Sequence, residues 1–342
     1  MNTIRTAAAS VIGARHARAA RNGQDAVASW SGMSGHRPAT DKGRTQLSQP
    51  TATDKGRTQL SQPTATDPVR ASVIVVSDGC SSGASSEVGA QLGANLFARA
   101  VGVRLEAGES PCDPAMWADA RAEVVAQLGA LADQMAGPRT GTGTDATYAT
   151  QIPERQLGCG SCVRPHLGCG SCVRPSSDDG FIEVVRDHFL FTIVAAAVRG
   201  DEAAVWAVGD GVYSFGDYTR ELGPFADNAP PYLGYDLLGD ARPAHFEVAA
   251  PHCGSIVIGT DGASEIIGGV EKFAGRRYVD HPDALRRELA LLARPAERID
   301  WDERRVVRTP ASLQDDCAIA VLRWEPASAA ASWSVVGVEA CS

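Results

Sequence analysis

The sequence predicts an α+β fold in which antiparallel strands form the core. Apolar, strand-like runs dominate the 342-residue chain, and the helical patterns are inserted in only two places. The alternation of strand and helix that builds parallel sheets is missing, which favours antiparallel sheets. The clearest strand is Val73–Gly79, reading V-I-V-V-S-D-G, because its β-branched apolar run is typical of a buried strand.

Size and composition are those of an ordinary globular chain. We expect a single domain over residues 1–342, interrupted by inserts at 31–70 and 137–178. A net charge of −9 and a pI near 5.3 argue against nucleic-acid and anionic-membrane partners. No apolar run is long enough to span a bilayer, and early basic residues interrupt any signal peptide. Nine cysteines in a chain too large to need disulfides fit a cytoplasmic protein. The oligomeric state is left open.

The N-terminal part predicts two strands joined by a basic and then acidic segment. A strand is expected at Ala9–Ile12, and the turn Asn22–Asp25 leads into a second strand at Ala26–Trp30. Several arginines precede Asp25. On its own, this segment is typical of a solvated turn.

The first insert, residues 31–70, contains a tandem repeat. The unit T-D-K-G-R-T-Q-L-S-Q-P-T-A occurs at Thr40–Ala52 and again at Thr53–Ala65. It is polar and nearly free of large apolar residues, so burial cannot offset the entropy lost on ordering. We expect a disordered surface loop.

The second insert, residues 137–178, duplicates the unit L-G-C-G-S-C-V-R-P and so creates two C-x-x-C pairs. Four thiolates could hold Zn²⁺ tetrahedrally. The gap between the pairs is shorter than in the usual zinc ribbons and fingers. We therefore expect free cysteines, with structural zinc as the alternative. The four residues are Cys159, Cys162, Cys169 and Cys172.

Helices and further strands complete the prediction. A helix is expected at Ser86–Ala100, and a second begins after Asp113, which can cap it, with Pro114 in its first turn. The remaining expected elements are a hairpin of Phe189–Val198 with Ala203–Ser214, an irregular stretch at Pro230–Leu233, a strand at Ser255–Gly259, a helix at Pro282–Ala293 and a last strand at Ala318–Trp324.

Acidic residues recur where these strands end. Asp-Gly follows or interrupts an apolar run at Asp78, Asp210 and Asp261, and the pair Asp315-Asp316 precedes the last strand. A single Asp-Gly is also a strong turn signal. Carboxylates gathered at neighbouring strand ends repel one another unless a cation lies between them. Oxygen ligands favour hard ions, so the sequence predicts a Mg²⁺ or Mn²⁺ site.

In this order, the motifs resemble the metal-dependent protein phosphatase 2C family, in particular its bacterial members. The resemblance runs from about Ser10 to Arg323 outside the two inserts, and it implies a four-layer α/β/β/α sandwich of two antiparallel sheets flanked by helices. The matching pieces are N-G-Q-D-A at Asn22–Ala26, S-D-G at Ser77–Gly79, V-G-D-G at Val208–Gly211, T-D-G-A-S-E at Thr260–Glu265 and D-D-C-A-I-A-V at Asp315–Val321.

The resemblance also implies roles for the acidic residues. Asp78 would bridge two Mg²⁺ or Mn²⁺ ions, and the carbonyl of Gly79 would bind the second ion. Asp261 and Asp315 would hold the first ion, and Asp25 would approach the second through water.

Several positions depart from the family pattern. Gln24 stands where many relatives have Glu, and Ala318 stands where Thr or Ser is usual. Cys80 stands where animal enzymes have a His that is assigned as the general acid. We interpret Cys80 as a small buried residue beside a turn, not as a nucleophile. No arginine stands at the offset expected for phosphate binding, and Arg18 and Arg21 on either side of it are the candidates.

The function implied is Mg²⁺- or Mn²⁺-dependent hydrolysis of phosphoserine and phosphothreonine on proteins by a metal-bridging water. Asp210 and Asp261 resemble the group that holds a third, looser ion in bacterial relatives. The first alternative is a pseudophosphatase that keeps the fold as a regulatory or binding module, with Gln24 and Cys80 marking lost chemistry. The second is a zinc-dependent interaction module built on the C-x-x-C pairs.

Overall fold

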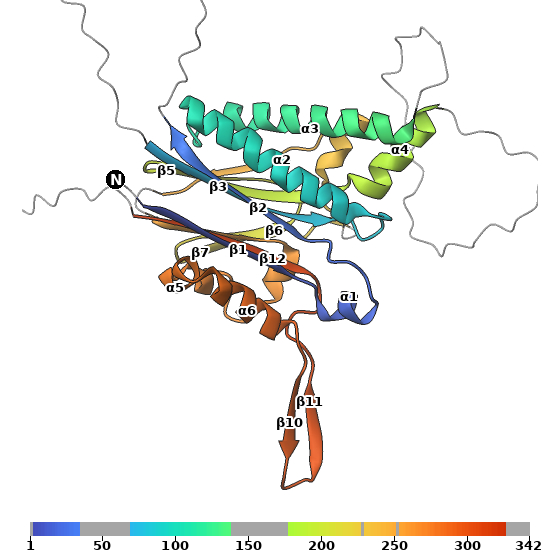
Figure 1. The fold of residues 1–342 in the computed structure, drawn as a ribbon, viewed down its shortest axis with the longest axis vertical. Helices are drawn as coiled ribbons and strands as arrows, with labels where there is room; N and C mark the ends of the chain where they lie inside the picture. Colours follow the sequence, from blue (N-terminus) through green and yellow to red (C-terminus); the bar gives the residue numbers. More distant parts are fainter. Residues whose placement is uncertain (1–2, 35–68, 138–176, 227–228, 251–252, 326–342) are drawn as a thin grey trace, which may run out of the picture.

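Two antiparallel sheets face each other, and helices cover the outer face of each (Figure 1). The structure is a computed structural model that describes residues 3–34, 69–137, 177–226, 229–250 and 253–325. The layer order is helices, sheet, sheet, helices. This arrangement confirms the α+β class and the four-layer sandwich.

The first sheet has the strand order β2-β3-β4-β5-β8 and lies under three helices (Figure 1). Its strands are β2 (Ala26–Ser34), β3 (Val69–Gly79), β4 (Phe191–Arg199), β5 (Glu202–Val208) and β8 (His245–Val248). The helices over it are α2 (Ser86–Ala107), α3 (Pro114–Ala136) and α4 (Ser177–His188). The carboxyl of Asp113 accepts a hydrogen bond from the Ala115 amide at 2.9 Å, which confirms the expected cap of α3.

The second sheet has the order β1-β12-β9-β6-β7 and is covered by two short helices and 3₁₀ turns. Its strands are β1 (Ile4–Val11), β12 (Cys317–Trp324), β9 (Ser255–Gly259), β6 (Gly211–Phe215) and β7 (Tyr218–Leu222). The other elements are α1 (Ala14–Arg18), α5 (Arg276–Asp280), α6 (Pro282–Leu292), the 3₁₀ turns η2 (Leu233–Leu238), η3 (Asp261–Glu265) and η4 (Glu271–Ala274), and a separate pair of strands, β10 (Ala296–Asp300) and β11 (Arg305–Thr309).

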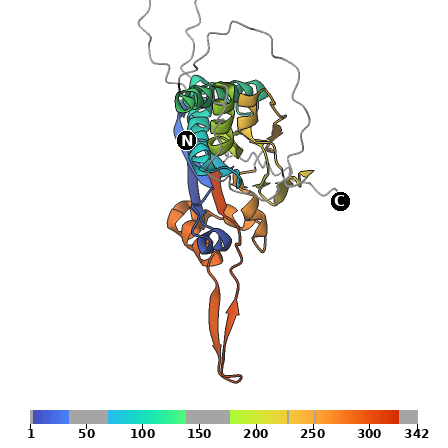
Figure 2. The same ribbon diagram turned by 90° about the vertical axis from the view of Figure 1, so that its right-hand side faces the viewer.

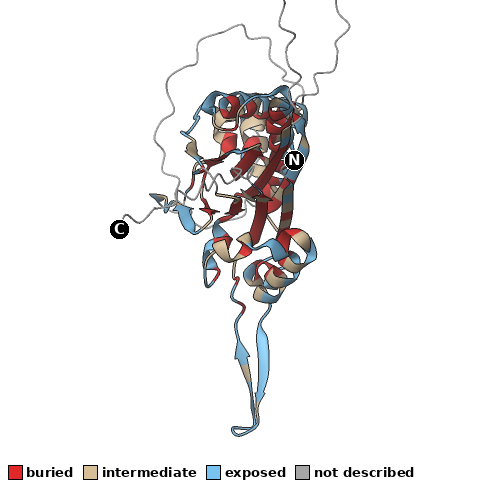
Figure 3. Cartoon of the chain, turned by 90° about the vertical axis from the view of Figure 1, so that its left-hand side faces the viewer, coloured by how far each residue is buried: buried red, intermediate tan, exposed pale blue. Residues whose placement is uncertain are grey.

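The apolar run in β3 follows from burial on both faces. Successive side chains of a strand point to opposite faces of the sheet. Val73 and Val75 therefore pack under the helices, while Ile74 and Val76 pack between the two sheets. All four are fully buried, and Figure 3 shows the buried colour running through both sheets.

The predicted hairpin at Phe189–Ser214 is wrong in its second half. The chain turns after β4 and pairs β5 with it, as expected, but β5 ends at Val208. Gly209 and Gly211 have φ angles of 106° and 138°, a backbone conformation that favours glycine. With this bend the chain leaves the first sheet and enters the second as β6.

The edges of both inserts also need correction. Ser31–Ser34 and Val69–Arg70 belong to strands β2 and β3, and Ser177 begins helix α4. The rest of each insert, including both repeats and the cysteines Cys159, Cys162, Cys169 and Cys172, lies outside the described residues.

Other boundaries differ less from the prediction. Strand β1 begins at Ile4 instead of Ala9, and α2 continues to Ala107. Helix α4 and the β10–β11 pair were not predicted. Within the described ranges, no helix is long and apolar enough to cross a membrane.

The helical layer is anchored by three stacked aromatic rings. The rings of Phe97, Trp117 and Trp206, from α2, α3 and β5, lie 4.7 to 6.3 Å apart between centroids.

We expect Trp117→Ala to lower the free energy of unfolding by about 3–5 kcal/mol in urea titrations. Asp113→Ala, which removes only a helix cap, should lower it by about 1 kcal/mol. Equal losses in the two variants would contradict this picture of the core.

Candidate metal centre

Five acidic residues from distant parts of the chain come together at one end of the sandwich. They precede β2, end β3, lie between β5 and β6, follow β9 and precede β12. The electrostatic influence of these carboxyls on one another shows that they are neighbours. We call them the carboxylate cluster: Asp25, Asp78, Asp210, Asp261 and Asp315.

Desolvation makes four carboxyls of this cluster unfavourable to ionise. Desolvation raises the pKa of Asp25 to about 8, although hydrogen bonds from Asp78 and Thr260 oppose the shift. Burial and then the charges of Asp25 and Asp261 raise the pKa of Asp78 well above its usual range. Burial and the charge of Asp261 raise the pKa of Asp210 to about 6. Burial also raises the pKa of Asp261.

Two oxygens of the cluster lack any partner among the described residues. They are Oδ1 of Asp25 and Oδ1 of Asp210, and both are buried. A buried carboxylate oxygen without a partner carries a desolvation penalty that a cation would remove. Oxygen donors, burial and excess negative charge together fit Mg²⁺ or Mn²⁺.

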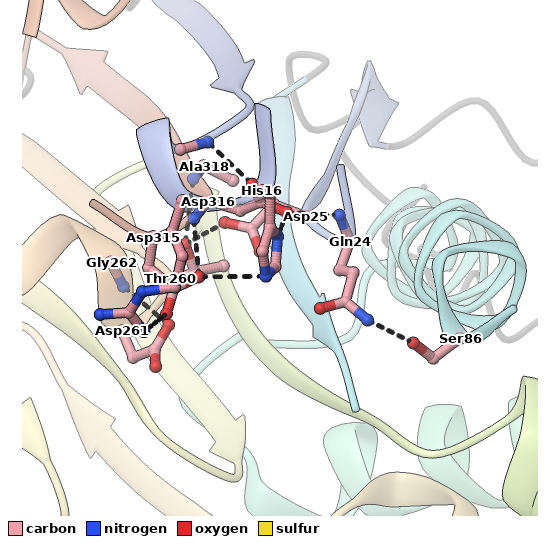
Figure 4. A network of polar contacts seen from close by, with 12 residues as sticks. His16, Gln24, Asp25, Ser86, Thr260, Asp261, Gly262, Asp315, Asp316 and Ala318 are labelled. Atoms are coloured by element: carbon pink, nitrogen blue, oxygen red, sulfur yellow. Dashed lines mark hydrogen bonds and ion pairs between the residues drawn. The ribbon is translucent and has the colours of Figure 1, made fainter. Parts of the chain in front are cut away.

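The cluster is not arranged as a finished ligand set. Within the described residues, no three His, Cys, Asp or Glu side chains are grouped so that they could hold an ion as they stand. The hydroxyl of Thr260 donates to Oδ2 of Asp25 at 2.5 Å, and the amide of Gly262 donates to Oδ1 of Asp261 at 2.7 Å (Figure 4). Side chains must therefore turn when a cation binds.

Asp316 differs from its neighbour Asp315 because it connects three segments. Its buried carboxyl accepts hydrogen bonds from the amides of Gly13 (2.8 Å) and Gln24 (2.7 Å) and from Nδ1 of His16 (2.8 Å) (Figure 4). Asp316 thereby fixes α1 and the turn before Asp25. The sequence predicts Asp315-Asp316 as one acidic site, and the structure divides it into a partly exposed carboxyl and a buried one.

His16 was missed by the sequence reasoning. It is buried, and its Nε2 lies 3.8 Å from Oδ1 of Asp315 while its Nδ1 holds Asp316. One imidazole therefore contacts both carboxyls of the pair. In the sequence, His16 stands among arginines, a pattern that is also typical of a solvated surface, so nothing there indicates that it is buried.

Gln24, one of the predicted departures from the family pattern, has a structural role. Its side chain donates to Oγ of Ser86 at 3.1 Å, and Ser86 donates to the carbonyl of Cys80 at 2.7 Å. The Gly79 amide donates to the Gln24 carbonyl at 3.3 Å. A Cβ on Gly79 would lie 2.8 Å from Oγ of Ser86, so glycine is required here by close approach to α2.

The side chain of Cys80 is buried, which agrees with our interpretation of it as a small residue beside a turn. Its Sγ lies 3.0 Å from Oγ of Ser82. Burial, then a hydrogen bond to Cys80, raises the pKa of the Tyr232 hydroxyl, and the charges of Asp78 and Asp210 add to this shift. Tyr232 therefore lies beside the cluster, a position that the sequence did not predict.

The two candidate arginines are exposed: Arg18 is the last residue of α1, and Arg21 lies on the loop between α1 and Asp25. Arg18 is engaged, because its guanidinium donates to the Ala14 carbonyl at 2.9 Å and to Oε1 of Gln314 at 3.0 Å. The side chain of Arg21 is exposed and has no hydrogen bond within the described residues. A third arginine, Arg15, has its Nη1 3.9 Å from Oδ2 of Asp315.

Comparison with known proteins gives one family match. The family model described as Protein phosphatase 2C matches residues 62–298, more than half of the chain. The matched range includes Asp78, Asp210 and Asp261. The sequence matches no curated protein.

Several solved structures resemble the fold at low sequence identity. The serine/threonine phosphatase Stp1 from Staphylococcus aureus has a TM-score of 0.44 and 12% identity, covering 94% of this chain and 96% of that one. The catalytic domain of the phosphatase PstP, in complex with 2 manganese ions, has a TM-score of 0.43 and 12% identity, covering 95% and 99%. PppA from Pseudomonas aeruginosa has a TM-score of 0.43 and 14% identity, covering 95% and 100%.

The raised pKa values predict how stability of the metal-free protein depends on pH. The pKa of Asp25 rises from 3.8 to about 8 on folding. Between these values the folded chain keeps a proton that the unfolded chain releases. We therefore expect the free energy of unfolding in EDTA to fall as pH rises from about 4 to 8, by up to about 1.4 kcal/mol per pH unit for each retained proton.

Urea titrations at several pH values measure this slope. Asp78→Asn should flatten it, whereas Asp217→Asn, at an exposed position, should leave it unchanged. Added Mn²⁺ should raise the melting temperature more at pH 8 than at pH 5, because the ion competes with the retained protons. Stability that is constant or increases over this range would show that the carboxyls are not buried together.

Proposed function

The chain belongs to the protein phosphatase 2C family, and we propose that it hydrolyses phosphoserine and phosphothreonine on proteins with Mg²⁺ or Mn²⁺ held at the carboxylate cluster. The observation that carries this proposal is a group of mutually repelling carboxyls in which buried oxygens of Asp25 and Asp210 have no partner among the described residues. It would be a metal-dependent serine/threonine protein phosphatase acting on cytoplasmic phosphoproteins.

The cluster would divide between two ions. Asp78 would lie between them, with the carbonyl of Gly79 on the second ion and Asp261 and Asp315 on the first. Asp25 would belong to the surroundings of the second ion. When bound, such ions lower the pKa of a coordinated water and neutralise charge on the phosphoryl group. Asp210 with Asp261 would provide a third, weaker position.

The surrounding residues would hold the cluster in place. Thr260 accepts a hydrogen bond from the Ala318 amide at 2.9 Å and donates to Asp25, so it fixes one carboxyl relative to β12. Asp316 and His16 support Asp315 from the other side. These contacts exist before any ion binds, so they would hold the backbone of the cluster in place while the carboxyl side chains turn toward a cation.

Arg21 is the better of the two candidates for binding the phosphate. Its guanidinium is exposed and unengaged within the described residues, whereas that of Arg18 is held by Ala14 and Gln314. The forked donors of arginine suit two oxygens of one phosphoryl group. We therefore assign the binding of substrate phosphate to Arg21, with Arg18 as the alternative.

A catalytically inactive binding module is the second candidate function. It is favoured by the lack of a preassembled ligand set in the described part of the chain and by the structural use of Gln24. The two candidates differ in one assay. An active phosphatase hydrolyses an aryl phosphate when Mn²⁺ is added, and a binding module does not.

We expect Asp78→Asn to abolish this Mn²⁺-dependent hydrolysis while the protein stays folded. The substitution keeps the shape of the side chain and removes its charge, and losing several kcal/mol of metal-ion stabilisation corresponds to about a thousandfold in kcat. Asp261→Asn and Asp315→Asn should behave similarly, and Asp217→Asn is the matched control. Full activity of the Asp78 variant would refute the assigned site.

The two arginines should respond differently to substitution. Losing a charge-assisted hydrogen bond of about 1.5–3 kcal/mol predicts that Arg21→Ala lowers kcat/KM by about 10- to 100-fold. Arg18→Ala should lower it less, because that side chain already binds the protein. Steady-state kinetics with an aryl phosphate measure both, and the reverse ranking would transfer the assignment to Arg18.

A further inference from the structure

A two-stranded ribbon projects from the end of the sandwich. Strands β10 and β11 form a separate sheet joined by the turn 301–304, and Figures 1 and 2 show it extending beyond the helices below the second sheet. We call residues 296–309 the projecting ribbon. Nearly all of it is exposed (Figure 3).

The ribbon exposes apolar side chains that usually need a covering surface. Ile299 and Val306 are cross-strand neighbours and are therefore on one face, with exposed fractions of 54% and 56%. Trp301 at the turn is 78% exposed. An isolated two-stranded ribbon is at best marginally stable in water, and both of its outer edges offer unpaired backbone groups to another strand.

We propose that the β10 edge of the projecting ribbon pairs with the β10 edge of a second copy of this chain. The pairing is antiparallel, about a two-fold axis at Ile299. The two ribbons then form a continuous four-stranded sheet. A two-fold axis needs a surface that is complementary to itself. If one residue of the first copy faces a given residue of the second, the same two residues also face each other with the copies exchanged.

The sequence of β10, A-E-R-I-D, meets this requirement. With the axis at Ile299, Arg298 of each copy faces Asp300 of the other, on the same face of the sheet. Ile299 meets Ile299 at the centre. The proposed pairing thus contains two opposite-charge pairs around one apolar pair.

Neighbouring registers are less favourable. Moving the axis to Arg298 places the two Arg298 side chains against each other. Moving it to Asp300 places the two Asp300 side chains against each other. An axis midway between two residues is excluded, because it would oppose side chains that lie on different faces of the sheet.

The β10 edge suits this pairing better than the β11 edge. Residues 304–309, R-R-V-V-R-T, contain three arginines and no acid, so two copies of this edge carry only like charges. Glu297 and Arg308 already form an ion pair of 2.9 Å across the ribbon. Arg298, by contrast, makes no hydrogen bond or ion pair within the described residues and remains available.

Sedimentation velocity with the full chain tests this proposal through two charge reversals. We expect the wild type to approach twice its chain mass of 35.8 kDa as its concentration rises. Arg298→Asp alone and Asp300→Arg alone should remain monomeric, because each places like charges opposite each other. An equimolar mixture of the two variants should dimerise, because both contacts between unlike variants are then attractive.

Two controls keep the result interpretable. Arg287→Asp, an equal charge change on the exposed side of α6, should leave the dimer intact. Arg298→Asp keeps Asp300, which is opposite Arg305 and accepts a hydrogen bond from the Glu303 amide at 3.2 Å, and dimerisation of the mixture shows that the ribbon of each variant is still folded.

A monomer at every concentration would overturn the proposal and leave the ribbon to a different protein partner. Variants that remain dimeric, or a mixture that remains monomeric, would equally overturn the β10 pairing. None of these outcomes depends on phosphatase activity, so the dimer and the proposed function are tested separately.

Discussion

Mutual repulsion among buried carboxyls is the constraint on which this end of the sandwich depends. Folding buries Asp25, partly buries Asp78 and places both near the more exposed Asp261. The charge of Asp261 makes ionisation of Asp25 and of Asp78 less favourable. Only protons or cations can relieve such an arrangement. The stability that permits this repulsion comes from three apolar layers. One lies between the two sheets, and the other two lie between each sheet and its helices.

The carboxyls in and beside the cluster differ in how fully they are hydrogen-bonded. Asp316 is buried like Asp25, yet its carboxyl accepts hydrogen bonds from two amides and an imidazole and anchors the surrounding segments. In the part of the chain that the structure describes, one oxygen of Asp25 accepts a hydrogen bond and the other has no partner. The two buried aspartates therefore differ in the number of hydrogen-bond donors around them. Asp316 has enough donors to be stable as it is, whereas Asp25 keeps an oxygen that a cation could bind.

Much of the fold and of the carboxylate cluster could be predicted from the sequence, because strands and Asp-Gly turns have local sequence signals. The V-I-V-V run predicted β3, and the Asp-Gly pairs pointed to Asp78, Asp210 and Asp261 of the cluster. Locality also explains the failures. The apolar residues 203–214 form one continuous pattern although Gly209 passes the chain between two sheets. The ribbon at 296–309 has no buried face and hence no hydrophobic period, and nothing local distinguishes Asp316 from Asp315.

Anomalous X-ray scattering from crystals grown with Mn²⁺ would test most directly whether the carboxylate cluster holds cations. We predict anomalous peaks in contact with Asp78 and with carboxyls of Asp25, Asp261 or Asp315, and their disappearance when crystals are grown with EDTA. Ordered density for the carboxyls without any manganese beside Asp78 would contradict the assignment. The buried charges would then have to be neutralised by protons alone.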